Sequence, residues 1–322
     1  METVRLGRTE VEVPRIALGT WGHGGPKKVG KHPVGWSGYD SGAARAALEL
    51  AFDRGLTHWD TADVYGDGQA ERSIGSLWGS VRRAQLFLAS KVGWDAGPYD
   101  HFYHPDQIRR QLERSLVNLQ TEYLDLYYLH HCDFGPNNEY LDGAVEQLRR
   151  FRDEGKIRFI GLSDWKSEKA VEYADRVDPD VVQPYRNVVD DSWEISGLKN
   201  WVEENDAGVA FFSPLKHGLL LGRYQEPPLL GDGDHRSRIP GFRDPAQLDR
   251  FRDCRKAVEA RFPSLPHPVL SCLTGVLLTD ATSGCAILGL RQPHHVRAAA
   301  LVGASLTQED ADWVRSLYRG EA

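Results

Sequence analysis

Short apolar runs alternate with longer stretches of helical spacing along almost the whole sequence, and this alternation constrains the fold most strongly. The apolar runs are continuous rather than alternating with polar residues, as expected for parallel strands covered by helices. The expected strands span residues 15–20, 56–59, 85–93, 123–130, 157–163, 181–183, 208–213 and 284–289. Eight such units favour a closed barrel over an open doubly wound sheet.

We therefore predict an α/β protein with a (β/α)8 TIM barrel, an N-terminal β-hairpin and an extra C-terminal helix, as a single domain over residues 1–322. No Gly-x-Gly-x-x-Gly follows the first strand, so a Rossmann interpretation lacks its phosphate-binding turn. Residues 4–13 predict the hairpin, residues 23–40 a long loop, and Ser41 is expected to cap the next helix. Further helices are expected near 69–78, 105–119, 139–153, 167–175, 195–205, 246–261, 268–279, 293–302 and 307–318.

Composition and charge exclude several classes of protein. The formal net charge of -7 argues against a general binder of nucleic-acid phosphates. The first ten residues, METVRLGRTE, lack the apolar stretch of a secretory signal, and no run is long enough to span a membrane. The four cysteines have no zinc spacing. We expect a cytoplasmic protein with reduced thiols, no metal, no membrane partner and a small-molecule substrate.

Four polar residues lie where the second, third and fourth expected strands end. Asp60 ends the second strand, Tyr65 follows in the loop, Lys91 ends the third strand and His130 the fourth. Barrel enzymes carry their active sites at the carboxyl ends of the strands, so these side chains should be neighbours. A buried carboxylate needs a partner, and Lys91 is the candidate partner of Asp60. The structural alternative is an ion pair that only joins strands, beside a core histidine.

Three motifs contain these residues in order: DTADVYG at 60–66, LASK at 88–91 and DLYYLH at 125–130. Together they resemble the aldo-keto reductase superfamily, in particular its long-loop branch of sugar and inositol oxidoreductases and potassium-channel beta subunits. The resemblance implies an NADP-dependent oxidoreductase that interconverts a carbonyl and an alcohol by hydride transfer. It also implies a TIM barrel with an Asp, Tyr, Lys and His tetrad at the ends of successive strands.

The resemblance implies a role for each of the four residues. Tyr65 would be the general acid or base, although a free phenol has a pKa of about 10. Lys91 would lower that pKa by stabilising the phenolate, and Asp60 would hold Lys91 in place. His130 would donate a hydrogen bond to the carbonyl oxygen.

The resemblance further implies a track for the cofactor, NADPH. Ser163 and Asp164 would hold the nicotinamide carboxamide with Gln183, although Asp164 replaces the usual Asn and cannot donate a hydrogen bond. Arg236 or Arg238 would add a phosphate contact, and the sequence does not choose between them. The expected cofactor-binding residues are Thr20, Trp21, Asp60, Ser163, Asp164, Gln183, Phe212, Ser213, Pro214, Leu215, Gly218, Arg223, Gly289, Arg291 and His295.

The segment ILGLRQPHHVRAAALV, residues 287–302, is similar to the family's adenosine site. Arg291 would grip the 2′-phosphate with its planar fork, so NADPH should be preferred over NADH. Ala298 and Ala299 replace the Glu-Asn pair that many members use on adenine, and His295 stands at a position often occupied by Gln. Adenine must therefore be held differently, by stacking or by Arg297.

The substrate pocket is expected to contain Trp21, Trp94, His131 and Trp165. Trp36, Tyr99 and Phe102 are further candidates, and the folding of the loops decides which side chains line the mouth. Aromatic rings beside His131 and Asp133 favour a sugar-like or other polar carbonyl. The alternative function is a pyridine-nucleotide-binding regulatory subunit with little turnover. A barrel glycosidase would need paired carboxylates at strand ends, and only Asp60 has such a position.

Overall fold

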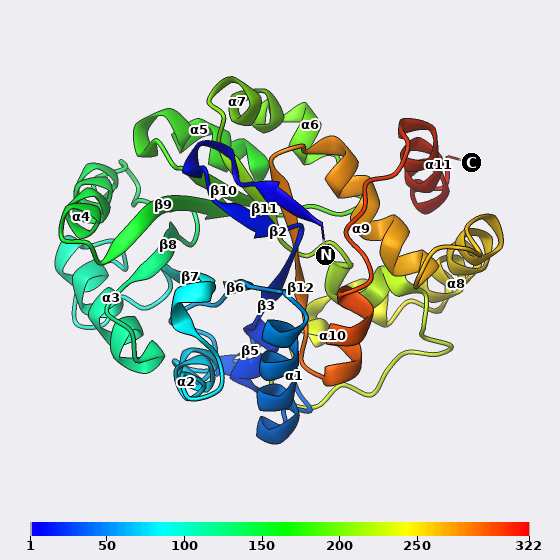
Figure 1. Ribbon diagram of the computed structural model, residues 1–322, viewed down its shortest axis with the longest axis horizontal. Helices are drawn as coiled ribbons and strands as arrows, with labels where there is room; N and C mark the ends of the chain where they lie inside the picture. Colours follow the sequence, from blue (N-terminus) through cyan, green and yellow to red (C-terminus); the bar gives the residue numbers. More distant parts are fainter. Residues whose placement is uncertain (1, 322) are drawn as a thin grey trace.

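The computed structural model describes residues 2–321 and contains a closed barrel in which eight parallel strands follow the order β10-β11-β12-β3-β6-β7-β8-β9 (Figure 1). The predicted (β/α)8 barrel is therefore confirmed. The strands of the barrel are β3 (Ile16–Gly19), β6 (His58–Asp60), β7 (Phe87–Val92), β8 (Leu124–Leu129), β9 (Ile157–Asp164), β10 (Val181–Pro184), β11 (Gly208–Phe211) and β12 (Gly284–Gly289).

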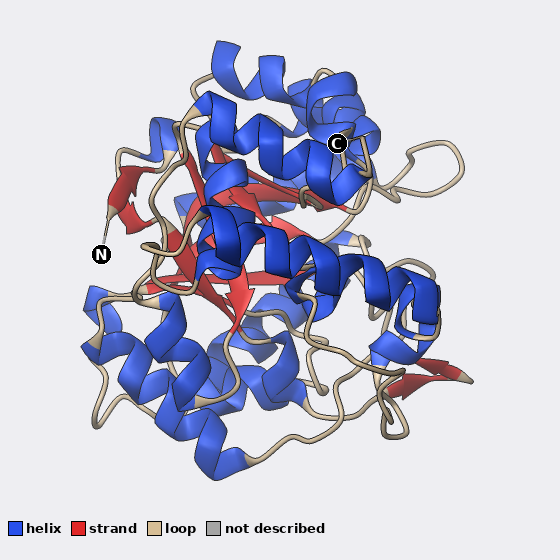
Figure 2. Ribbon diagram, turned by 90° about the vertical axis from the view of Figure 1, so that its right-hand side faces the viewer, coloured by secondary structure: helices blue, strands red, loops and turns tan. Residues whose placement is uncertain are grey.

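Helices surround the barrel on the outside of the strands (Figures 1 and 2). In α3 the buried residues Ile108, Leu112, Leu116 and Leu119 recur at helical spacing, which explains why this segment packs as an amphipathic helix. The helices are α1 (Ser41–Asp53), α2 (Gln69–Gly75), α3 (Pro105–Leu119), α4 (Leu141–Asp153), α5 (Ser167–Val177), α6 (Ser192–Ile195), α7 (Leu198–Glu204), α8 (Pro245–Arg261), α9 (Pro268–Asp280), α10 (Pro293–Ala299) and α11 (Gln308–Arg319). None of the helices in residues 2–321 combines the length and apolarity needed to cross a membrane.

Local backbone chemistry moves some element boundaries away from the predicted ones. The cap of α1 is Asp40 rather than Ser41, because the extended Asp40 accepts a hydrogen bond from the Ala43 N–H at 2.6 Å. The predicted helix 195–205 is divided into α6 and α7 at Gly197, which has a φ of 85°. The second barrel strand begins at His58, since the Leu56 N–H still bonds to Ala51 at the end of α1.

The N-terminal hairpin closes the bottom of the barrel. Its strands β1 (Thr3–Arg5) and β2 (Glu12–Pro14) pair antiparallel, and Leu6 at its turn is fully buried in the cluster that fills the barrel interior. A Cβ atom on Gly7 would lie 2.2 Å from the Gly208 nitrogen. Only glycine at position 7 therefore lets the hairpin approach β11 this closely. The opposite end of the barrel, where the carboxyl ends of the strands lie, is the open one.

Two long loops meet over that open end. Residues 23–40, predicted as a plain loop, contain a small hairpin of β4 (Lys28–Val29) and β5 (His32–Pro33). We call residues 231–238, in the loop after β11, the strap. The Gly35 N–H donates to the Gly233 carbonyl at 3.1 Å, and the His235 N–H donates to the Gly35 carbonyl at 2.8 Å. The strap and the first loop therefore form one continuous cover.

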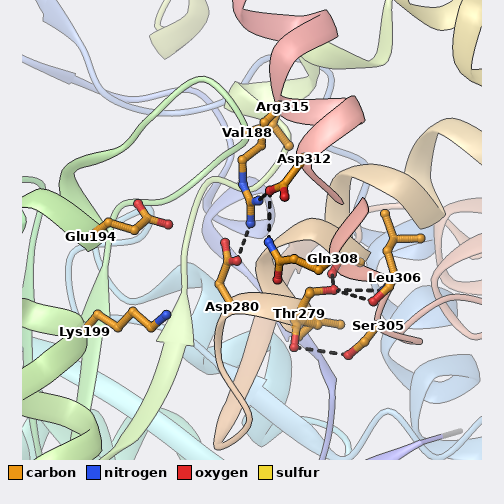
Figure 3. A network of polar contacts seen from close by, with 12 residues as sticks. Val188, Glu194, Lys199, Thr279, Asp280, Ser305, Leu306, Gln308, Asp312 and Arg315 are labelled. Atoms are coloured by element: carbon orange, nitrogen blue, oxygen red, sulfur yellow. Dashed lines mark hydrogen bonds and ion pairs between the residues drawn. The ribbon is translucent and has the colours of Figure 1, made fainter. Parts of the chain in front are cut away.

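A network of ion pairs fixes the C-terminal helix α11 to the end of α9 (Figure 3). Arg315 pairs with Asp280 and with Asp312, and the fully buried Arg186 reaches Asp280 at 2.9 Å from the loop after β10. Thr279 adds a hydrogen bond by accepting from the Leu306 N–H at 2.9 Å. These contacts hold α9 against the barrel, where its residue Leu270 lines the pocket described below.

Candidate active site

Asp60 and Lys91 form a buried ion pair at the ends of the neighbouring strands β6 and β7. The Lys91 ammonium donates to Asp60 Oδ1 at 2.6 Å and to the Thr61 carbonyl at 2.7 Å, and its side chain is 1% exposed. Burial lowers the pKa of Lys91, and the nearby Asp60 carboxylate opposes this shift. Gln183 Nε2 donates to the second oxygen, Asp60 Oδ2, at 2.8 Å. The carboxylate is thus held from both sides.

Tyr65 lies above this pair, in the loop after β6. The Lys91 ammonium is 5.2 Å from the centroid of the Tyr65 ring. The Tyr65 ring stacks on Trp21 at 6.2 Å between centroids and meets the edge of His130 at 5.9 Å. Asp60, Tyr65 and His130 all line one pocket, and Lys91 lies buried beside them. The four residues singled out in the sequence are therefore neighbours in space.

The pKa of Tyr65 shifts in the direction opposite to the one expected from the sequence. Burial raises it well above its usual value, and the charges of Asp60 and Asp63 act in the same direction. Burial is the main physical reason, and the positive charge of Lys91, paired with Asp60 at 2.6 Å, does not reverse the shift. At neutral pH the phenol therefore keeps its proton, which is the form that a general acid requires.

His130 is a neutral imidazole at the same place. Burial lowers its pKa well below the usual value, and the charges of Lys91 and His131 add to this effect. Within residues 2–321 its Nδ1 atom has no hydrogen-bond partner. A neutral imidazole donates from one ring nitrogen, so His130 can present a donor to a carbonyl oxygen.

The pocket extends over the carboxyl ends of the strands and collects most of the predicted cofactor residues. Two of them do not line it. Thr20 is buried and donates to the Asp60 carbonyl at 3.0 Å. The Asp164 carboxylate accepts from the backbone N–H groups of Cys132 at 2.7 Å and Lys166 at 2.8 Å, so it organises loops instead of facing the pocket. The predicted residues that line the pocket are Trp21, Asp60, Ser163, Gln183, Phe212, Ser213, Pro214, Leu215, Gly218, Arg223, Gly289, Arg291 and His295.

The predicted substrate residues are also only partly on the pocket wall. Trp94 and Trp165 line the pocket with 53% and 41% of their surface exposed, and Trp21 and Trp36 line it as well. His131 does not, because it is buried behind Trp94 with a ring-centroid distance of 4.2 Å, and its Nε2 atom bonds to the Gly93 carbonyl.

Tyr99 and Phe102 are likewise absent from the pocket wall, and three histidines missed in the sequence, His32, His217 and His235, are present. His217 and His235 face each other at 5.1 Å between ring centroids and contact Trp21 at 5.7 and 4.9 Å. Both lie in the long loop after β11. His217 lies between Leu215 and Gly218, which the sequence did predict for the pocket, whereas His235 is placed there by the joining of the strap to the first loop.

The cations of the pocket differ in whether a carboxylate neutralises them. Arg236 makes two hydrogen bonds to Asp234, at 2.9 and 2.7 Å. By contrast, Arg223, Arg238 and Arg291 form no ion pair with any carboxylate in the described part of the chain. Arg291 donates to the Ser37 carbonyl at 2.8 Å and lies 5.3 Å from the Trp36 ring centroid. Unneutralised guanidinium groups suit an anionic ligand, and of the two arginines left open above, Arg238 is the available one.

Comparison with known proteins agrees with this geometry. The model of the Aldo/keto reductase family matches residues 15–319. The chain belongs to the aldo/keto reductase family. This aldo-keto reductase is 29% identical to aldo-keto reductase YhdN of Bacillus subtilis (strain 168), over 96% of its own length and 91% of that protein. It is 28% identical to the NADH-specific methylglyoxal reductase of Escherichia coli (strain K12), over 69% and 70% of the two chains.

Solved structures of other aldo-keto reductases have the same barrel. The glycerol dehydrogenase of Gluconobacter oxydans aligns with a TM-score of 0.80 at 25% identity, over 98% of this chain and 94% of that one. An aldo-keto reductase of Klebsiella pneumoniae in complex with NADPH aligns with a TM-score of 0.68 at 28% identity, over 99% and 95%. The predicted family, fold and enzyme class are confirmed, and the relatives include proteins named for either nicotinamide cofactor.

Proposed function

We propose that this enzyme reduces a carbonyl group with NADPH and that Tyr65 supplies the proton. The observation that supports this proposal is the meeting of Tyr65, His130 and the Asp60–Lys91 pair in a pocket that also contains unneutralised arginines. Bound NADPH would supply the hydride. The phenol of Tyr65 gives its proton to the developing alkoxide, and His130 donates a hydrogen bond to the same oxygen. Lys91, 5.2 Å from the ring centroid, stabilises the phenolate that remains.

The residues near the tetrad suit the nicotinamide end of the cofactor. Ser163 Oγ donates to the Gln183 carbonyl at 2.9 Å, which fixes Gln183 beside the pocket. The Gln183 side-chain nitrogen is engaged by Asp60, so its oxygen is the atom left to accept from the carboxamide NH₂. Phe212 lies on the same wall with its ring at 4.9 Å from Trp165 and offers an apolar face to the nicotinamide ring.

The proton donor is tested by Tyr65→Phe. Loss of the phenol should lower the rate of carbonyl reduction by a factor on the order of 10² to 10⁴, the usual contribution of general acid catalysis. NADPH affinity, measured by fluorescence titration, should barely change. Tyr99→Phe is the matched control, because Tyr99 does not line the pocket. Near-normal turnover in Tyr65→Phe would show that another group supplies the proton.

The choice of NADPH over NADH is tested at Arg291, which lines the pocket without a carboxylate partner. A charge-assisted contact to the 2′-phosphate contributes about 1.5–3 kcal/mol, roughly tenfold to a hundredfold in affinity. Arg291→Ala should weaken NADPH binding by this factor and leave NADH binding almost unchanged. Arg297→Ala is the control, since Arg297 is exposed on α10 away from the pocket wall. Equal losses for both cofactors would contradict the proposed contact.

The exposed faces of Trp94 and Trp165, together with His217 and His235, favour a sugar-like or other polar carbonyl as substrate. Aromatic rings stack on the C–H faces of such molecules, and imidazole nitrogens bond to hydroxyl groups. A panel of sugars, hydroxyaldehydes and aliphatic aldehydes with NADPH distinguishes the classes, and activity only on long aliphatic aldehydes would refute this preference. NADPH binding without turnover on the whole panel would instead indicate a regulatory subunit. The cytoplasmic location stays a prediction.

A further inference from the structure

One end of the pocket is formed by α9, α10 and the loop after β11, and none of the described residues that line the pocket from these three elements has a carboxylate or amide side chain. Its apolar surface comes from Leu221, Leu270 and Ala298, and its polar side chains include Arg223, Arg291 and His295. The carboxylates and the amide that do line the pocket are Asp60, Asp67, Asp95 and Gln183. Asp60 ends β6, Asp67 and Asp95 lie in the loops after β6 and β7, and Gln183 lies in β10, whereas α10 follows β12.

If the nicotinamide lies at the tetrad, as in the proposed function, the second nucleoside of the cofactor must occupy this other end. A carboxylate at that place would accept a hydrogen bond from the 6-amino group of adenine and would repel the 6-oxo group of hypoxanthine. The leucine and alanine side chains pack on either purine equally. The guanidinium groups only donate, and N7, which both bases carry, is the acceptor that they can meet in either case.

His295 and the phenol of Tyr224 are further polar side chains at this end, and His295 adapts to either base. Its Nδ1 atom is buried and has no hydrogen-bond partner among residues 2–321. Burial, together with the charges of His294 and Arg291, lowers its pKa to about 4, so the ring is neutral at pH 7. A neutral imidazole accepts at one nitrogen and donates at the other, and exchange of the tautomer reverses the two.

We propose that this enzyme binds 6-oxopurine dinucleotides as well as 6-aminopurine dinucleotides, so that reduced nicotinamide hypoxanthine dinucleotide phosphate is a cofactor comparable to NADPH. The proposal rests on the proposed function, because that function places the nicotinamide. It concerns only the purine end, so its failure can be distinguished from failure of the proposed function. If the protein binds NADPH but rejects the hypoxanthine analogue, the proposed function stands and this inference is wrong.

The test is a fluorescence titration of the full-length protein with NADPH and with its hypoxanthine analogue. The two dissociation constants should agree within about threefold, since no group at this end distinguishes the 6-positions by more than a weak contact. Discrimination of more than about threefold against the analogue in the parent protein would overturn the proposal. Failure of both ligands to bind would refute the proposed function itself and this inference with it.

Ala298→Glu provides a second, independent measurement. It introduces a carboxylate at the wall of the pocket, and the preference for NADPH over the analogue should rise by about tenfold. Ala300→Glu is the matched control: Ala300 ends α10 and does not line the pocket, so the same charge there should leave the ratio unchanged. Equal changes for both ligands in Ala298→Glu would show that the purine does not lie against Ala298, which would also overturn the proposal.

Discussion

Asp63 is a carboxyl group buried without a partner, only three residues from Asp60 in the chain. Its exposed fraction is 0%, and within the described residues neither oxygen has a hydrogen-bond partner. The charged groups around it are Glu71 on α2, Asp95 after β7 and Arg114 on α3. Burial raises the pKa of Asp63 to about 8, Glu71 and Asp95 raise it further, and Arg114 opposes them. The group is therefore protonated at neutral pH.

This shift predicts how stability depends on pH. In the unfolded chain the carboxyl group ionises near pH 3.9, whereas in the folded protein it keeps its proton up to about pH 8. Between these values the folded state binds more protons, so its stability falls as the pH rises, and above about pH 8 the full cost is present. Four pKa units at 1.36 kcal/mol each give a cost on the order of 5 kcal/mol, an appreciable part of a typical stability.

Asp63→Asn removes the ionisation and keeps the shape of the side chain. We expect its free energy of unfolding in urea to exceed that of the parent by a few kcal/mol at pH 8 and by about 1–2 kcal/mol at pH 5. Asp53→Asn is the control, because Asp53 is exposed at the end of α1. The reasoning is refuted if the difference between Asp63→Asn and the parent is the same at both pH values, or if the variant is the less stable protein at pH 8.

Two further predictions concern the barrel interior. Lys91→Met removes the cation 5.2 Å from the Tyr65 ring. It should lower the rate of carbonyl reduction at least tenfold and move the rate–pH profile to higher pH. If the profiles of variant and parent coincide, Lys91 has no electrostatic role. Gly161→Ala places a Cβ atom 2.2 Å from the Tyr128 ring, so it should destabilise the fold by about 1–3 kcal/mol in thermal unfolding. An unchanged Tm would show that the ring can move aside.

The sequence predicts the barrel and the positions of the tetrad residues because both follow from short patterns and from their order along the chain. Buried parallel strands are recognisable as apolar runs, and the carboxyl ends of neighbouring strands must meet, so Asp60, Lys91 and His130 are placed once the strands are known. The role of Asp164 could not be predicted in this way, since its partner is the backbone N–H of Cys132, which has no signature in the sequence. The pKa of Tyr65 likewise depends mainly on how deeply the fold buries the phenol, with Asp60 and Asp63 acting in the same direction, and the sequence does not show this burial.

The backbone hydrogen bonds between Gly35 and the strap also determine how a dinucleotide reaches its site. The pocket is lined by the first loop at Trp36, by the strap at Arg236 and by the barrel mouth at Asp60, so a ligand inside it is enclosed on opposite sides. We expect entry and release of a dinucleotide to require these hydrogen bonds to open, together with the exposed Lys28–Asp232 ion pair at 2.5 Å. If the cofactor binds as proposed, loop opening should set its lifetime, and cofactor exchange rather than hydride transfer should limit turnover on the fastest substrates.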